Sequence, residues 1–268
     1  MFEKVVVPLD GSTEAHRAVT VATSIARASA APLEVLSFVT DERDPIGRES
    51  FLRAQVGDQG DLEVRYKIAE LEGDAAAALI DELGEEPGDL LVMTTRGVGR
   101  MGAVLGSVAE SVVRDAHHPI LIVGPHVSHD GPAIAGGPLV AFVDGSDSAE
   151  TGLPIATQWA LAYDMPPTIA QVIDLEVTDP TYPSDSSYVT RLANEYTEAS
   201  GHQFDHEVLY ERDTADAIIN YLESSGAALG LMTTHGRTGI ARFVMGSVAM
   251  RVVHRAPCPI LLSRPANT

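Results

Sequence analysis

The chain contains one set of short motifs twice, and this duplication limits its possible folds more than any other feature. The segment from Gly106 to Ile122 matches the segment from Gly246 to Leu262 at ten of seventeen positions. A second pair of segments, 7–12 and 141–146, also agrees and ends in Asp-Gly-Ser in both copies. A repeat of this length predicts two copies of one domain rather than the units of a solenoid.

A length of 268 residues suits two domains of ordinary size. The apolar share of 45% allows each copy to bury a core of its own. The stretch 126–137 contains Gly-Pro and Gly-Gly-Pro, which are typical of a linker. We therefore expect a first domain at 1–125, a linker at 126–137 and a second domain at 138–268.

Within each copy, short β-branched runs alternate with longer amphipathic runs. In the first copy we expect strands at 4–8, 33–39, 62–68, 89–93 and 120–123, and helices at 12–30, 48–58, 74–83 and 107–116. In the second copy we expect strands near 138–143, 168–173, 205–210, 228–232 and 259–263, with helices between them. This alternation predicts an α/β fold with two repeated doubly wound, Rossmann-like domains. The ligand crevice of such a sheet lies at the carboxyl ends of its strands.

Charge and composition exclude several classes of partner. A net charge of −20 argues against nucleic acid and anionic membranes as partners. No apolar run approaches the roughly 20 residues of a membrane helix, and the N-terminus lacks the pattern of a signal peptide. The single cysteine, Cys258, fits a reducing compartment, so we expect a cytoplasmic protein. The acidic, lysine-poor composition also suggests a halophilic source as a hypothesis.

A glycine-rich loop that opens a helix recurs after the fourth expected strand. In the second copy, Gly236 and Gly239 permit a close approach of ligand to backbone, and Gly246 and Ser247 open the helix. The free N–H groups at such a helix start favour an anion. This loop can cradle phosphates without the lysine of a Walker motif, which the chain lacks.

Asp10 and Asp144 each stand between a first strand and a Gly-Ser pair. A carboxylate there is placed to accept a hydrogen bond from a base amino group or a ribose hydroxyl. Ser12 and Ser146 suit a helix-capping turn equally well, so both interpretations of the serines stay open.

The pairing of Asp-Gly-Ser after strand one with Gly-x9-Gly-Ser after strand four resembles the universal stress protein family in its tandem two-domain form. The resemblance covers nearly the whole chain outside the linker. It implies a five-stranded parallel sheet of order 3-2-1-4-5 in each domain, ATP as the bound ligand with or without Mg²⁺, and a loop pattern of G-x2-G-x9-G-[ST].

The resemblance also implies which residues contact the nucleotide. In the first copy these are Asp10, Phe38, Thr94, Gly97, Gly106 and Ser107; in the second they are Asp144, Ile173, Thr233, Gly236, Gly246 and Ser247. Two departures matter. Threonine replaces the first glycine of the pattern in both copies, and the first copy has one residue fewer in the loop. The second crevice is therefore the stronger candidate.

Three functions compete. The first is a stress-response or regulatory protein that holds ATP or another adenine nucleotide as a ligand, with slow hydrolysis at most. The second is an enzyme, but no catalytic residue recurs in both copies, and the adenylating and phospho-acceptor patterns are missing. The third is a protein-interaction module of the same fold that binds no nucleotide. No histidine grouping predicts a metal, so His118 is expected at the surface, and Trp159 and Cys258 are expected in the core.

Each predicted sheet has an edge strand that requires covering. In the resembled family the fifth strands pair across a dimer. Here residues 120–123 and 260–263 are expected to pair within one chain and to form a pseudo-dimer. A homodimer through another face and a protein partner of unknown identity are further expectations.

Overall fold

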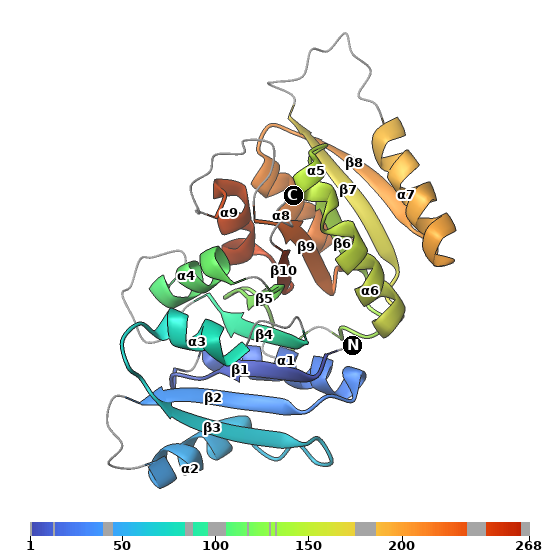
Figure 1. Cartoon of the computed structure of the whole chain (residues 1–268). Coiled ribbons are helices and arrows are strands. Elements are labelled where there is room, and N and C mark those ends of the chain that lie inside the picture. The colour runs from blue at the N-terminus through green and yellow to red at the C-terminus, as the bar shows by residue number, and fades with distance from the viewer. Residues whose placement is uncertain are drawn as a thin grey trace.

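The fold is described from a computed structural model. It describes residues 2–12, 14–39, 45–83, 88–95, 106–116, 118–128, 130–131, 133–174, 186–234 and 245–263. Two halves of the chain follow each other, β1 to β5 and β6 to β10, and each alternates strands with helices (Figure 1).

The first half follows the predicted alternation closely. Its strands are β1 (Lys4–Pro8), β2 (Leu33–Val39), β3 (Val64–Glu70), β4 (Asp89–Thr94) and β5 (Ile120–Val123). Its helices are α1 (Ala15–Ser29), α2 (Pro45–Val56), α3 (Ala75–Leu83) and α4 (Ser107–Asp115). Strand β3 begins and ends two residues later than the apolar pattern predicts, and α2 begins three residues earlier.

The second half repeats these elements with one difference. Its strands are β6 (Leu139–Val143), β7 (Pro167–Asp174), β8 (Asp205–Glu211), β9 (Leu229–Thr233) and β10 (Ile260–Ser263). Its helices are α5 (Asp147–Glu150), α6 (Leu153–Tyr163), α7 (Ser187–Ser200), α8 (Thr214–Ser224) and α9 (Ser247–Arg255).

The expected single first helix of the second half is split into α5 and α6. Gly152 separates the two helices, and Pro154 occupies the first turn of α6, where its missing N–H costs nothing. A Cβ on Gly152 would lie 2.8 Å from Cδ2 of Leu231 in β9. The break therefore lets the backbone lie close to the sheet, whereas Ala18 at the equivalent position continues α1 without interruption.

The ten strands form one continuous sheet in the order β3-β2-β1-β4-β5-β10-β9-β6-β7-β8. Within each half the pairs are parallel and the order is the predicted 3-2-1-4-5. The halves join where β5 pairs with β10 in antiparallel register, with Leu121 opposite Leu261. The expected intrachain pairing of the fifth strands is thus confirmed, and neither β5 nor β10 is left as an edge.

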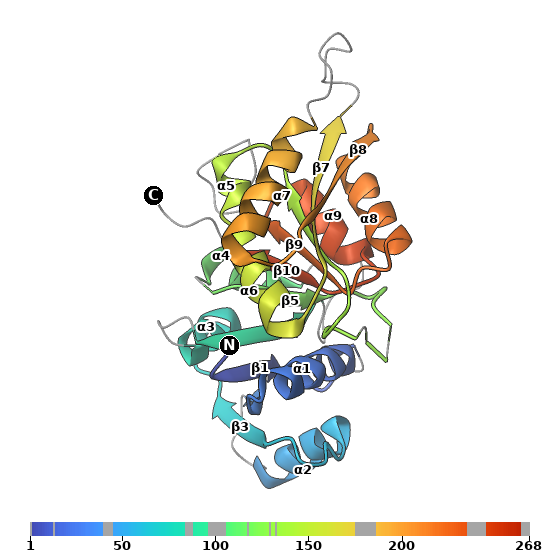
Figure 2. The same cartoon turned by 90° about the vertical axis from the view of Figure 1, so that its right-hand side faces the viewer.

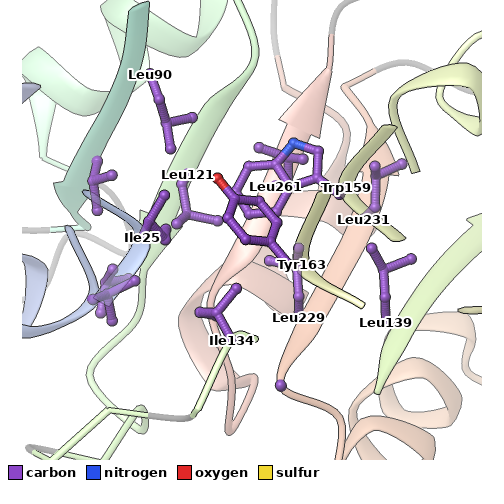
Figure 3. Packing of buried hydrophobic residues seen from close by; sticks show 14 of the residues in the cluster. Ile25, Leu90, Leu121, Ile134, Leu139, Trp159, Tyr163, Leu229, Leu231 and Leu261 are labelled. Atoms are coloured by element: carbon purple, nitrogen blue, oxygen red, sulfur yellow. The ribbon is translucent and has the colours of Figure 1, made fainter. Parts of the chain in front are cut away.

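Helices cover both faces of this sheet (Figure 2). One apolar cluster packs α1, α2, α6 and α7 against one face, and a second packs α3, α4, α8 and α9 against the other. The first cluster runs across the junction of the halves: Ile25 and Leu121 come from the first half, and Trp159, Tyr163 and Leu261 from the second (Figure 3). The two halves therefore share a core as well as a sheet.

A near-twofold relation between the halves is visible at this junction. Ser29 near the end of α1 and Tyr163 at the end of α6 occupy the same position of the repeat, and their hydroxyl oxygens lie 2.6 Å apart. Burial raises the pKa of Tyr163, and the hydrogen bond to Ser29 partly offsets this effect. A contact between equivalent positions is the signature of an isologous interface, here formed within one chain.

Candidate functional site

The Asp-Gly-Ser turns lie at the carboxyl ends of β1 and β6, where a parallel sheet places its ligand crevice. Oδ1 of Asp10 accepts from the Ser12 amide at 2.9 Å, and Oδ1 of Asp144 accepts from the Ser146 amide at 3.0 Å. The glycine between them has φ of +94° in the first turn and +85° in the second, which favours glycine. Each turn therefore holds its carboxylate at the end of the first strand of its half.

Both serines accept a hydrogen bond near a helix start, but only Ser146 is an N-cap residue, because the N-cap of α1 is Glu14. Oγ of Ser12 accepts from the amide of Ala15 at 3.3 Å, and Oγ of Ser146 accepts from that of Ala149 at 3.2 Å. In the second half the Ser146 hydroxyl also donates to Asp144 Oδ1 at 2.6 Å. The capping interpretation is therefore confirmed for Ser146, whereas Ser12 bonds the first residue of α1 from outside the N-cap position.

Helices α4 and α9 begin beside the adjacent strands β4 and β9. The amide of Gly106 donates to the carbonyl oxygen of Thr95 at 2.7 Å, and the amide of Gly246 donates to that of Thr234 at 3.2 Å. The N-cap residue is glycine in both helices, so no N-cap side chain accepts from their first amides. By contrast, Ser146 caps α5 and Asp213 caps α8.

The first residues of α4 and α9, Ser107 and Ser247, are exposed. A backbone bond thus anchors each helix start at the carboxyl edge of the sheet, and the first amides of a helix favour an anion.

The predicted loop glycines Gly97 and Gly236 lie outside the described residues. The threonines before them are described: Thr94 ends β4 half-buried, and Thr233 ends β9 with an 8% exposed side chain. Both lie at the edge that also carries the aspartates.

Phe38 and Ile173 were expected to hold the same position of the repeat, and the strand register shows that they do not. Leu36 lies opposite Pro8, and Ala170 lies opposite Phe142, which fills the position of Pro8 in the second half. Phe38 therefore corresponds to Val172, and both side chains pack against the same apolar cluster. Because strand side chains alternate, Ile173 points to the other face of the sheet.

Two side chains that the sequence analysis missed approach the strand ends from α2 and α7. In the first half, Arg48 donates from Nε and Nη2 to Ser37 Oγ, at 3.0 and 2.8 Å, and from Nη2 to the Leu9 carbonyl oxygen at 3.3 Å. In the second half, Tyr188 Oη donates to Glu150 Oε1 at 2.9 Å. The sequence spacing could have indicated their inward direction. Arg48 and Tyr188 each lie four residues, about one helical turn, before a buried leucine of the same helix, Leu52 or Leu192.

A groove of about 760 Å³ lies elsewhere, along α1 and beside Asp130, Gly131 and Ala133. Its lining includes Arg27, whose Nη2 donates to the carbonyl oxygen of Gln59 at 2.9 Å, and the buried Thr23. Thr23 Oγ1 has no hydrogen-bond partner, whereas the equivalent Thr157 donates to the Leu153 carbonyl oxygen at 2.9 Å. This groove follows a helix and does not cross the strand ends.

Three residues outside the crevices test other expectations. Trp159 is 1% exposed, and Cys258 is 2% exposed with its thiol pKa raised by burial to about 12, so both are core residues as expected. His118 was expected at the surface, and this is wrong, because its exposed fraction is 4%. It precedes β5, which lies at the centre of the continuous sheet, and its counterpart in the repeat is the buried Cys258.

Two further searches concern only the part of the chain that the structure describes. No group of three or more His, Cys, Asp or Glu side chains there is arranged to hold a metal ion. No helix among these residues has the length and apolar character that a membrane crossing requires.

The fold defines a tandem α/β protein that carries the same aspartate turn and the same glycine-capped helix start at the strand ends of each half. A model of the universal stress protein family matches residues 1–124 and 137–264. These matches span most of the chain, which therefore belongs to the universal stress protein family.

Individual relatives agree with this assignment. A universal stress protein of Thermus aquaticus is 32% identical over 143 residues, which span 46% of this chain and 99% of that protein. One from Mycolicibacterium smegmatis is 26% identical over 200 residues, which span 71% of this chain and 66% of that protein. The crystal structure of a universal stress protein from Archaeoglobus fulgidus superposes with a TM-score of 0.72 at 17% identity, covering 98% of this chain and 99% of the other. This last likeness concerns the fold alone.

Proposed function

We propose that this chain is a regulatory protein of the stress response that holds ATP, or another adenine nucleotide, at the strand carboxyl ends. The observation that carries the proposal is the double occurrence of a carboxylate turn beside a helix start with a glycine N-cap. The aspartate is suited to ribose hydroxyls, and the amides of α4 and α9 are suited to phosphates.

We place the two nucleotide domains at 1–125 and 138–268, with 126–137 as the linker between them. The contact residues are those that the family resemblance implies, except that Val172 replaces Ile173 as the counterpart of Phe38. A cytoplasmic location and ATP binding with or without Mg²⁺ belong to the same proposal. The nucleotide acts as a bound ligand, and no residue is assigned a catalytic role.

The test is mass spectrometry of nucleotide released from the purified and denatured protein, followed by titration of nucleotide into the variants Gly246→Val and Gly106→Val. Gly246→Val suits this purpose because, among the described residues, the atom nearest to a Cβ there is the Thr234 carbonyl oxygen, at 3.6 Å. Each variant should lose binding at one crevice and retain it at the other.

A wild-type protein that carries no nucleotide, and binds none more tightly than about millimolar, would reject this function. The chain would then act as a protein-interaction module of the same fold, which is the alternative that the threonines at the first loop position favour.

A further inference from the structure

The groove beside α1 has a polar lining that belongs to the first half of the chain. Its hydrophilic side chains follow α1 at successive helical turns and are His16, Thr20, Thr23, Ser24 and Arg27. Ala30 and Asp164, the left-handed residues after α1 and α6, hold the same position of the repeat. Counted from them, the equivalent residues of the second half are Glu150, Pro154, Thr157, Gln158 and Leu161. Only the threonine is common to both halves, so the groove is not part of the duplicated strand ends.

The size and the lining of the groove define the kind of molecule that fits. Its volume of about 760 Å³ lies within the range of small-molecule sites, about 300–1,000 Å³. Val19 and Val56 supply a short apolar strip, and Gln59 adds an amide beside the hydroxyl groups of α1. The described residues that line it include no phenylalanine, tyrosine or tryptophan, so a nucleotide base finds no ring on which to stack. The groove therefore suits a small polar molecule other than a nucleotide.

Two opposite charges line the groove without pairing. Among the described residues, neither Arg27 nor Asp130 takes part in an ion pair, with each other or with any other side chain. Arg27 Nη2 donates to neutral acceptors, the carbonyl oxygen of Gln59 at 2.9 Å and its Oε1 at 3.2 Å. The guanidinium thus keeps its capacity for an anionic partner, and the carboxylate keeps its capacity for a cationic one.

The two charges are separated along the axis of α1. Gly131, the neighbour of Asp130, lies against Thr20, because a Cβ on this glycine would lie 3.2 Å from Thr20 Cγ2. Arg27 follows Thr20 by seven residues, which is about 10 Å along the helix axis. An extended peptide spans about 3.3–3.6 Å per residue, so about three residues cover this separation.

A buried hydroxyl in the wall of the groove lacks the bond that its counterpart makes. Thr23 is 5% exposed, and its Oγ1 has no hydrogen-bond partner among the described residues. The equivalent Thr157 donates to the carbonyl oxygen of Leu153 at 2.9 Å. A threonine in a helix has two favourable χ1 rotamers. After rotation about χ1, a polar group in the groove can bond the Thr23 hydroxyl and remove the penalty of leaving it unpaired.

We propose that this groove binds a short zwitterionic peptide of about three residues, with its carboxylate on Arg27 and its ammonium on Asp130. The hydroxyls of Thr20, Thr23 and Ser24 are suited to the peptide groups between the two ends. Both charged ends take part, because a polyanion such as ATP is repelled by Asp130 and a simple cation gains nothing from Arg27. The groove is then a second ligand site, separate from the nucleotide at the strand ends.

The test is calorimetric titration of trialanine, a tripeptide with two charged ends, into the full-length protein. We expect binding, and binding about tenfold or more weaker when the peptide is acetylated at its N-terminus and amidated at its C-terminus. Arg27→Gln and Asp130→Asn should each weaken trialanine binding about fivefold to tenfold. Thr23→Val removes the unpaired hydroxyl at nearly constant shape. It should weaken binding about twofold to tenfold without lowering the melting temperature of the free protein.

Arg53→Gln is the matched control, because Arg53 lies outside the groove lining, is 58% exposed and pairs with Glu49. It should bind trialanine as the wild type does, and so should Gly246→Val and Gly106→Val, which alter the strand ends. No binding of trialanine at about 10 mM overturns the inference. Equal binding of the uncharged peptide, or full affinity in folded Arg27→Gln and Asp130→Asn proteins, overturns it as well. None of these results touches the proposed function, which the release and titration of nucleotide test separately.

Discussion

The two sets of strand ends share their backbone and differ in the side chains beside them. Both have an aspartate held by its own turn and a helix start with a glycine N-cap. The first is closed by the arginine of α2 and the second by the tyrosine–glutamate pair between α7 and α5. The two halves have thus kept the same turn and the same helix start and differ in the side chains beside them.

The halves also differ in what each contributes to their common core. Equivalent positions of the repeat carry Ile25 in the first half and Trp159 in the second, and both side chains are buried at the junction (Figure 3). The Trp159 ring packs edge-on against Phe2 of the first half, with centroids 5.7 Å apart, and against Tyr163 at 5.1 Å. Trp159 therefore packs against aromatic rings from both halves of the chain.

The largest expected effect on stability comes from replacing Trp159 or Ile25 with alanine. Trp159→Ala should lower the free energy of unfolding by about 3–5 kcal/mol, and Ile25→Ala by about 2–5 kcal/mol, because each leaves a cavity in the shared core. Urea denaturation followed by circular dichroism measures both. Because the core is shared, each variant should unfold in one transition. A variant with two separated transitions would show that the halves are stable independently.

The next largest effect concerns the reactivity of the Cys258 thiol. Cys258 is buried just before β10, at the position that His118 holds before β5. The thiol pKa of about 12 leaves roughly a thousandfold less thiolate at neutral pH than the ordinary value of 9.0 gives. Iodoacetamide at pH 8 should therefore modify the folded protein at least a thousandfold more slowly than the urea-unfolded chain.

The pH dependence of stability follows from the same shift. The folded pKa of Cys258 lies above the unfolded value, so the thiol contributes stability below about pH 9, and this contribution is lost as the pH rises toward 12. Cys258→Ala should lack this part of the alkaline decline. If the folded wild type is labelled quickly while its circular dichroism is unchanged, β10 opens without global unfolding, and the two central strands are not equally stable.

The sequence predicts the fold well because the evidence for it is local and present twice. Alternating apolar runs place the strands, and the fifth strands each require a partner, which they find in each other. The contacts of Arg48 escape prediction because α2 carries apolar residues on its exposed face, such as Ile46, which obscures the direction of Arg48. The matching of Phe38 with Ile173 fails for a different reason, since a shift of one residue in a strand exchanges its two faces.

A smaller effect is expected where the chain leaves β5 and passes α9 of the other half. A Cβ on Gly124 would overlap the carbonyl oxygen of Val253, so the backbone of one half must shift to accept it. Gly124→Ala should destabilise the protein by about 1–3 kcal/mol, as overpacking does. Gly246→Ala is the matched control, because its nearest neighbour lies at 3.6 Å, and it should be close to neutral. Equal melting temperatures for the two variants would contradict this close approach between the halves.

The smallest expected effect on stability concerns the side chains that cap helices α3 and α8. Oδ1 of Asp74 accepts from the amides of Ala76 and Ala77 at 3.0 Å, and Asp74→Ala should cost about 1 kcal/mol through loss of this cap. Asp213 caps α8 in the same way, and it also receives Arg251 Nη1 at 2.7 Å, where the first half has Ser111.

The Arg251→Ser variant copies the first half at this position. The hydrogen bond from Arg251, with backbone bonds, lowers the pKa of Asp213, so the pair stabilises the fold above about pH 3.8, and this contribution is lost as the pH falls below that value. Because both side chains are exposed and screened, the fall in melting temperature should be smaller than for Asp74→Ala and should vanish in molar salt. A fall that persists in molar salt would mean that Arg251 stabilises the second half through packing, and that the helices of the two halves differ by more than a surface ion pair.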